Sequence, residues 1–240
     1  MENYPLALVT GAAHRVGRTF ALTLARQGYA ILLHYHHSAE EAAATAEEVR
    51  TLGVPVYPMQ ADLTEVTQIR SLFSTTDSLN FRLKVLVNSA AWMKRTDLRT
   101  VSADEWDASL NLNLRAPFLL AQFAAQRMTE GGLIVNVSDA GAGKAWTGFS
   151  AYLVSKAGLE VLTRLMAKTY APTIRVNAIA PGLVLPSVDV STEEWEKLVD
   201  RLPLKHPASL DEIAYALEFL LKNESVTGQT IVVDGGYSLI

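Results

Sequence analysis

The chain has 240 residues, of which 49% are hydrophobic and 19% are charged, and it contains no cysteine. This length and composition are typical of one globular domain with a sizeable core, and they exclude a disordered chain. The net charge of −4 argues against a general nucleic-acid binder, because neutralising phosphates requires a clustered basic surface. The absence of cysteine excludes disulfides and thiolate metal ligands.

The first residues lack the basic and then apolar pattern of a signal peptide. No stretch of the sequence approaches the roughly 18 uninterrupted apolar residues that a membrane-spanning helix needs. We therefore expect a cytoplasmic protein that forms a single domain over residues 1–240, with no membrane or nucleic-acid partner.

Short apolar runs alternate along the chain with segments whose apolar residues have helical spacing. In chain order the pattern predicts strand 6–9, helix 17–27, strand 30–33, helix 40–52, strand 54–59, helix 65–73, strand 84–87, helices 103–114 and 117–128, strand 133–137, helix 151–169, strand 174–179, helix 210–221 and strand 230–233. Strands that are apolar at every residue suit a parallel sheet buried on both faces. Right-handed crossovers then predict an α/β fold with a doubly wound, Rossmann-like sheet of seven parallel strands and helices on both faces.

One segment breaks this alternation. Residues 183–206 contain prolines and one short predicted helix, 192–199. Ligands of open α/β sheets bind beyond the carboxyl ends of the strands, so an insertion at this point is a candidate substrate lid.

A glycine-containing loop joins the first predicted strand to the first helix, where residues 10–17 read Thr-Gly-Ala-Ala-His-Arg-Val-Gly. Gly11 permits a tight turn, Gly17 permits close approach of helix and cofactor, and the helix N-terminus can receive a pyrophosphate. Two glycines alone are a weak signal, and a plain strand–helix turn is the alternative. Arg15 occupies the place of a third glycine in many such loops and adds a cation beside the phosphates.

The end of the second predicted strand carries histidines and no acid before Glu40. An NAD-dependent dehydrogenase usually places Asp or Glu there to bind the ribose 2′-hydroxyl. His36, His37 and Ser38 suit a 2′-phosphate instead, which predicts NADPH as the cofactor. A solvated loop is the alternative, whereas a metal site is not expected because no further ligand set completes it.

Tyr152 and Lys156 lie four residues apart on the helix predicted after the fifth strand, which puts both side chains on one helix face. An adjacent ammonium is expected to lower the pKa of a phenol toward a value useful for protonating a reduced product. A surface pair is the alternative reading of this spacing when it is taken alone.

Taken together, these motifs resemble the short-chain dehydrogenase/reductase family along essentially the whole chain. The resemblance implies that Tyr152 and Lys156 are catalytic, and that Asn113, with Asn111 as second choice, holds a proton-relay water. It implies a cofactor site made of Gly11, His14, Arg15, Val16, Gly17, His36, His37, Ser38, Asp62, Leu63, Asn88, Ala90, Tyr152, Lys156, Pro181, Gly182 and Leu183. Members of the family are usually homotetramers packed through the two longest helices and the last strand, and the resemblance implies the same here.

Two departures from the usual family pattern resemble the pteridine reductases. Asp139 stands thirteen residues before the tyrosine, where the family usually has serine, and the glycine loop has Arg15. In pteridine reductases an aromatic residue after the fourth strand stacks on the pterin. That position falls on Met93 here, directly after Trp92. This resemblance implies that Asp139 is catalytic together with Tyr152 and Lys156. The implied substrate contacts are Arg15, Trp92, Met93, Asp139 and Tyr152.

We therefore expect an NADPH-dependent reductase that transfers a hydride to a C=O or C=N bond of a small molecule, in the first place a pterin or dihydropterin. One alternative is a general carbonyl reductase of the 3-oxoacyl or sugar-ketone type. Another, of a different class, is a non-catalytic NADP-sensing protein, against which the intact pair of Tyr152 and Lys156 weighs.

Overall fold

A sheet of seven parallel strands forms the centre of the molecule in the computed structural model, which describes residues 4–79, 81–186 and 190–240. The strands are β1 (Pro5–Thr10), β2 (Ala30–Tyr35), β3 (Val56–Gln60), β4 (Arg82–Asn88), β5 (Gly132–Val137), β6 (Ile174–Pro181) and β7 (Thr230–Val233). Their spatial order is β3-β2-β1-β4-β5-β6-β7, so the direction of winding reverses between β1 and β4. This confirms the predicted doubly wound fold.

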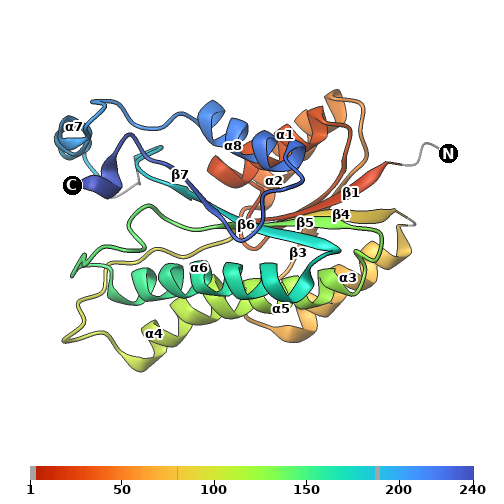
Figure 1. Ribbon diagram of the computed structural model, residues 1–240, viewed down its shortest axis with the longest axis horizontal. Helices are drawn as coiled ribbons and strands as arrows, with labels where there is room; N and C mark the ends of the chain where they lie inside the picture. Colours follow the sequence, from red (N-terminus) through yellow and green to blue (C-terminus); the bar gives the residue numbers. More distant parts are fainter. Residues whose placement is uncertain (1–3, 80, 187–189) are drawn as a thin grey trace.

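Helices cover both faces of the sheet. They are α1 (Arg15–Arg26), α2 (Ala39–Thr51), α3 (Val66–Ser78), α4 (Ala103–Leu110), η1 (Asn111–Arg115), α5 (Ala116–Ala125), α6 (Ser150–Tyr170), α7 (Thr192–Arg201), α8 (Leu210–Lys222) and η2 (Tyr237–Leu239). Helices α1, α2 and α8 lie on one face, α3 to α6 lie on the other, and α7 lies apart from both layers near the C-terminal end (Figure 1). None of the helices in the described part of the chain is long and apolar enough to span a membrane.

Strand β1 shows how the sequence pattern builds these two layers. Ala7 and Val9 belong to the core on the α1 side, whereas Leu6 and Leu8 belong to the core on the α5 side, and all four are completely buried. Alternate residues of a strand point to opposite faces, so a strand covered on both sides is apolar at every position. The uninterrupted apolar runs of the sequence follow from this burial.

The predicted helix 103–114 is wrong at its end. The α-helix ends at Leu110, and the five residues that follow form a π-helix that leads directly into α5. Pro117 has no N–H, so it cannot donate the α-helical hydrogen bond to the carbonyl of Asn113 four residues earlier. π-Helical turns of this kind are frequent at functional sites, and this one carries Asn113.

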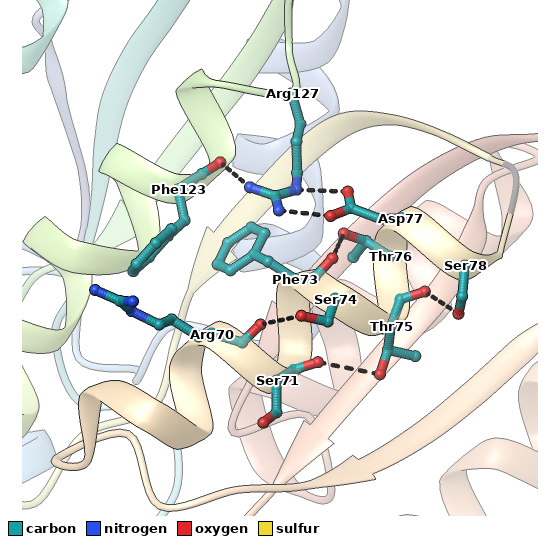
Figure 2. A network of polar contacts seen from close by, with 10 residues as sticks. All are labelled: Arg70, Ser71, Phe73, Ser74, Thr75, Thr76, Asp77, Ser78, Phe123 and Arg127. Carbon is teal, nitrogen blue, oxygen red and sulfur yellow. Dashed lines mark hydrogen bonds and ion pairs between the residues drawn. The ribbon is translucent and has the colours of Figure 1, made fainter.

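A polar and aromatic network ties α3 to the end of α5 on the outer layer, away from the carboxyl ends of the strands (Figure 2). The guanidinium of Arg127 donates to both carboxylate oxygens of Asp77 at 2.7 Å and to the carbonyl of Phe123 at 3.0 Å. It also lies 5.0 Å from the ring centre of Phe73, which contacts the ring of Phe123 at 5.6 Å. This two-pronged ion pair lowers the pKa of the Asp77 carboxyl.

Replacing Arg127 by methionine should therefore lower the free energy of unfolding by about 1 kcal/mol, because the paired hydrogen bonds and the cation–π contact are lost while the apolar stem remains. Arg127→Lys keeps the charge without the planar fork and should recover only part of this loss. Urea denaturation gives the free energy. The affinity for NADPH should not change, and a weaker affinity in Arg127→Met would contradict this assignment.

Candidate active site

Three neighbouring parallel strands, β1, β4 and β5, bring predicted site residues together at one edge of the sheet. Thr10 at the end of β1 is in register with Asn88 at the end of β4, and Asn88 is in register with Asn136 in β5. The Thr10 hydroxyl accepts hydrogen bonds from the N–H groups of Ser89 and Ala90 at 3.0 and 3.1 Å. The glycine loop and the segment after β4 are therefore held side by side.

The backbone of the glycine loop leaves no room for larger residues. Gly11 has a φ of +62°, and a Cβ at this position would lie 2.9 Å from the Cα of Ala90. A Cβ on Gly17 would lie 2.0 Å from the carbonyl oxygen of Gly11. Arg15 has a φ of +52°, so it adopts the left-handed conformation that the usual third glycine would favour.

This loop fits the pyrophosphate of a dinucleotide. Helix α1 begins at Arg15, and its first N–H donors have no partner inside the helix. Such a helix N-terminus, approached through a close-packed glycine turn, is a ready anion site. The described residues contain no group of three His, Asp or Glu side chains that could hold a metal ion.

The Arg15 side chain contacts the start of the predicted lid. Its guanidinium donates to the carbonyls of Leu185 and Pro186 at 2.9 and 3.0 Å. It therefore joins the glycine loop to the start of the predicted lid, and its contacts with phosphate and substrate stay a prediction. Residues 187–189 of the predicted lid lie outside the described residues.

His34 has a role in the fold that the sequence analysis did not assign. Its ring is 2% exposed, Nδ1 accepts from the Gly11 N–H at 3.2 Å, and Nε2 lies 2.9 Å from the Ala61 carbonyl. Nε2 must carry the proton in this arrangement, so the ring is neutral. Burial lowers the pKa of His34 to about 4. His34 thus connects the glycine loop to the segment that follows β3.

The residues predicted to select NADP lie at the surface directly after β2. The rings of His36 and His37 are exposed and lie with their centres 3.6 Å apart. Burial raises the pKa of the Asp62 carboxyl, but hydrogen bonds from Thr64 and the two neighbouring imidazoles outweigh it and lower this pKa. Leu63, in contrast, is only 3% exposed and packs in the core.

The segment after β6 approaches the last strand closely. A Cβ on Gly182 would lie 2.6 Å from the Cβ of Asp234, and the Gly182 N–H donates to Val233 at 2.9 Å. The carbonyl of Pro181 accepts from the Ala140 N–H at 2.9 Å. This turn therefore lies against the residue that follows Asp139.

The structure brings Asp139, Tyr152 and Lys156 together. The Tyr152 hydroxyl donates to Oδ2 of Asp139 at 2.8 Å, and Oδ1 of Asp139 accepts from the Gly141 N–H at 2.7 Å. The Lys156 ammonium lies 5.7 Å from the centre of the Tyr152 ring and donates to the Val137 carbonyl at 2.6 Å. Tyr152 and Lys156 are 6% and 3% exposed.

The expectation that the pKa of Tyr152 is lowered is wrong for this structure. Burial raises the pKa of Tyr152 well above its ordinary value, and the carboxylate of Asp139 raises it further. Burial also lowers the pKa of Lys156 to about 8, which the charge of Asp139 partly opposes. The phenol therefore stays protonated at neutral pH and can act as a proton donor.

Asn113 is completely buried, and its side chain is occupied by protein partners. Its Oδ1 accepts from the Trp92 N–H at 2.8 Å, while Nδ2 lies within 3.0 Å of the Trp92 carbonyl and 3.1 Å of the Ser155 hydroxyl. Ser155 in turn donates to the Tyr152 carbonyl at 2.6 Å. The side chain thus positions the segment after β4 against α6. Asn111 lines a groove between α4, α5 and α6.

The aromatic side chain beside Asp139 is not one of those predicted. Trp92 faces the Lys94 ammonium, which lies 5.6 Å from its ring centre, and Met93 is half exposed. Trp146, in the loop before α6, packs on Gly141, because a Cβ there would lie 2.4 Å from its ring. This loop has no regular hydrophobic period, so no sequence signal identified Trp146.

Comparisons with known proteins agree with this geometry. A family model described as Enoyl-(Acyl carrier protein) reductase matches residues 11–238. The 3-oxoacyl-[acyl-carrier-protein] reductase FabG of Staphylococcus aureus is 33% identical, over 96% of both chains. The 1-cyclohexenylcarbonyl-CoA reductase of Streptomyces collinus is 34% identical, over 98% of this chain and 87% of its own. The chain belongs to the short-chain dehydrogenase/reductase family.

One similar solved structure is named for the reduction of dihydrofolate and not of an acyl group. FolM Alternative dihydrofolate reductase 1 from Brucella suis, in complex with NADP, superposes with a TM-score of 0.93 and 33% identity, over 98% of this chain and 96% of that one. The predicted family and oxidoreductase class are confirmed, and NADP, the predicted cofactor, is the ligand of that neighbour. Acyl and folate reductases are equally identical to this chain, so overall similarity does not choose the substrate.

The geometry of His34 predicts a measurable loss of stability in acid. The unfolded-state pKa of 6.5 exceeds the folded-state value of about 4, so the unfolded chain binds more protons between these limits. The free energy of unfolding should therefore fall by about 3 kcal/mol from this residue as the pH drops from 6.5 to 4. His34→Asn should lack this component, which the difference between the two urea-denaturation profiles measures. Parallel profiles would contradict the neutral, buried ring.

Proposed function

We propose that this protein is an NADPH-dependent reductase of a dihydropterin or a closely related amino-pyrimidine ring. The observation that carries the proposal is the carboxylate of Asp139 hydrogen-bonded to the Tyr152 hydroxyl at 2.8 Å. A serine at this position would offer only a neutral hydroxyl. The name and high structural similarity of the Brucella FolM protein support the same class of substrate.

NADPH bound at this site would supply a hydride to the carbon of a C=N bond, and the nitrogen would then need a proton. Tyr152 donates that proton from its hydroxyl and is left as a phenolate. The Lys156 ammonium, 5.7 Å from the ring centre, stabilises this negative charge. A proton taken up from solvent then restores the phenol.

Asp139 selects the substrate by charge. An ionised carboxylate accepts hydrogen bonds from the N–H groups of an amino-pyrimidine, whereas it repels the negative charge that develops on a reduced ketone oxygen. The Gly141 N–H holds one carboxylate oxygen at 2.7 Å and so fixes its orientation. The ring thus binds with its nitrogen-bearing edge toward Asp139 and Tyr152.

A 3-oxoacyl thioester is the second candidate substrate. The similarity to FabG over almost the whole chain favours it. With such a substrate Asp139 would have to act as a protonated donor in the place of serine. A non-catalytic NADP sensor is disfavoured, because Tyr152, the proposed proton donor, and Lys156, its proposed partner, are both present and buried.

We also propose a homotetramer. Phe118, Val161 and Leu165 are 41%, 49% and 60% exposed, and they line the groove of about 560 Å³ between α5 and α6. Tyr215 and Phe219 on α8 are 63% and 44% exposed on a second face. Two separate apolar faces are what a tetramer with two kinds of two-fold interface requires.

The substitution Asp139→Ser tests the substrate. It should lower kcat/KM for a dihydropterin by about tenfold to a hundredfold, the value of a charged hydrogen bond of about 1.5–3 kcal/mol. Activity on a simple diketone or a 3-oxoacyl thioester should be kept or increased, because the carboxylate no longer opposes the developing oxyanion. Steady-state rates of NADPH oxidation with both substrates give the comparison.

Tyr152→Phe is the control for chemistry in the same assays, since removal of the proton donor should cost about 10²–10⁴-fold in kcat with both substrates. If wild type reduces the acyl thioester and not the dihydropterin, the pterin proposal is overturned. The same holds if Asp139→Ser leaves both activities unchanged.

Cofactor preference tests the imidazoles beyond β2. We propose that His36, His37 and Ser38 bind the 2′-phosphate of NADPH. The double substitution His36→Gln with His37→Gln should reduce the preference for NADPH over NADH by about tenfold, since charge-assisted hydrogen bonds are lost. Steady-state kinetics with both cofactors measure this preference. Equal preference in variant and wild type would contradict this role.

A further inference from the structure

A cluster of two aromatic rings and one lysine lies beside Asp139. Trp146 belongs to the loop between β5 and α6, and Tyr237 belongs to η2 near the end of the chain. Their ring centres lie 5.2 Å apart at an angle of 44°. Both side chains are only partly buried, so part of each ring remains available for contact. None of the motifs discussed above includes either ring.

The position of Trp146 relative to the reacting groups follows from Gly141. A Cβ on Gly141 would lie 2.4 Å from the Trp146 indole and 2.9 Å from Oδ1 of Asp139. The indole and the carboxylate therefore both lie against the same glycine and close to each other. A side chain at position 141 would collide with both groups.

Lys144 holds the two rings together. Its ammonium donates to the backbone oxygens of Tyr237 and Ile240 and lies 4.6 Å from the ring centre of Tyr237. It lies 6.0 Å from the ring of Trp146 as well. One cation therefore joins the loop that carries Asp139 to the segment that carries Tyr237.

Tyr237 is anchored from its other side too. The carboxylate of Asp234 accepts from the N–H groups of Gly236 and Ser238 at 2.8 and 2.7 Å, which fixes the turn before and within η2. Burial raises the pKa of the Tyr237 phenol, and the nearby charge of Asp139 raises it further.

We propose that Trp146 and Tyr237, clamped by Lys144, form an aromatic wall that binds the flat heteroaromatic ring of the substrate beside Asp139. This inference rests on the proposed function and names the surface that selects the ring. A flat ring can stack on these aromatic faces while its N–H groups reach the carboxylate, whereas a flexible acyl chain offers neither interaction. Lys144 acts as a positioning residue, because it holds the wall.

Binding of a ring that is not reduced tests the wall independently of turnover. The probe is 2,4-diaminopteridine, titrated by calorimetry into the whole protein saturated with NADP⁺. Trp146→Ala should raise the dissociation constant of the probe by about tenfold, and Trp146→Phe should restore most of the affinity because it keeps an aromatic face. The affinity for NADPH should be the same in all three proteins.

The clamp is tested by a matched pair of lysine substitutions. Lys144→Met removes the ammonium and keeps the length of the side chain, so this substitution should weaken probe binding by about fivefold. Lys144→Arg keeps the positive charge and should retain the affinity for the probe. Lys168→Met, at an exposed lysine in the last turn of α6, is the control and should bind the probe as wild type does. In turnover, Lys144→Met should raise KM for a dihydropterin and leave kcat nearly unchanged.

Unchanged probe affinity in Trp146→Ala, or no probe binding to wild type, would overturn the aromatic wall. If the variants bind the probe as expected but the wild-type protein does not reduce dihydropterins, the proposed function is overturned and the aromatic wall is not. Equal weakening of probe and NADPH binding by Lys144→Met would show a general structural role and would overturn the clamp.

Discussion

The arrangement of this site depends on one hydrogen bond, between a carboxylate and a phenol that is almost completely buried. Asp139 and Tyr152 come from the loop after β5 and from α6, and their contact joins these two elements at the carboxyl edge of the sheet. An anion next to a phenol makes loss of the phenolic proton more difficult. The Lys156 ammonium lies 5.7 Å from the centre of the same ring, so the Tyr152 phenol lies near charges of both signs.

The scaffold explains how such a charged group can be held in place. The carboxyl ends of parallel strands lie at one edge of the sheet. The short segments that follow these strands are connected there by hydrogen bonds from backbone N–H groups. The His34 side chain connects the segments that follow β1 and β3 by hydrogen bonds. The Asn113 side chain connects the segment after β4 to α6 in the same way. Both side chains are neutral and buried, and their nitrogen and oxygen atoms have hydrogen-bond partners. Buried polar groups stabilise a structure when they are paired in this way.

The sequence predicted the sheet, its parallel winding and the placement of Tyr152 and Lys156 on one helix face because those features have short-range signals. Apolar runs mark strands that are covered on both faces, glycines mark turns that exclude a Cβ, and the spacing of Tyr152 and Lys156 marks one helix face. The contacts of Arg15 have no such signal, since they depend on which loop lies opposite. Trp146 and Tyr237 are 91 positions apart in the chain. Only the folded structure brings them together, so periodicity and spacing could not indicate the wall.

The most direct test of this account is the pH dependence of kcat/KM for a dihydropterin in wild type and in Asp139→Asn. The amide keeps the size and one hydrogen bond of the carboxylate but removes its charge, so Tyr152 and Lys156 should both lose their protons at lower pH. The account predicts that the alkaline decline in kcat/KM begins at lower pH in Asp139→Asn than in wild type. Alkaline limbs that coincide would contradict the claim that the Asp139 carboxylate controls the proton donor.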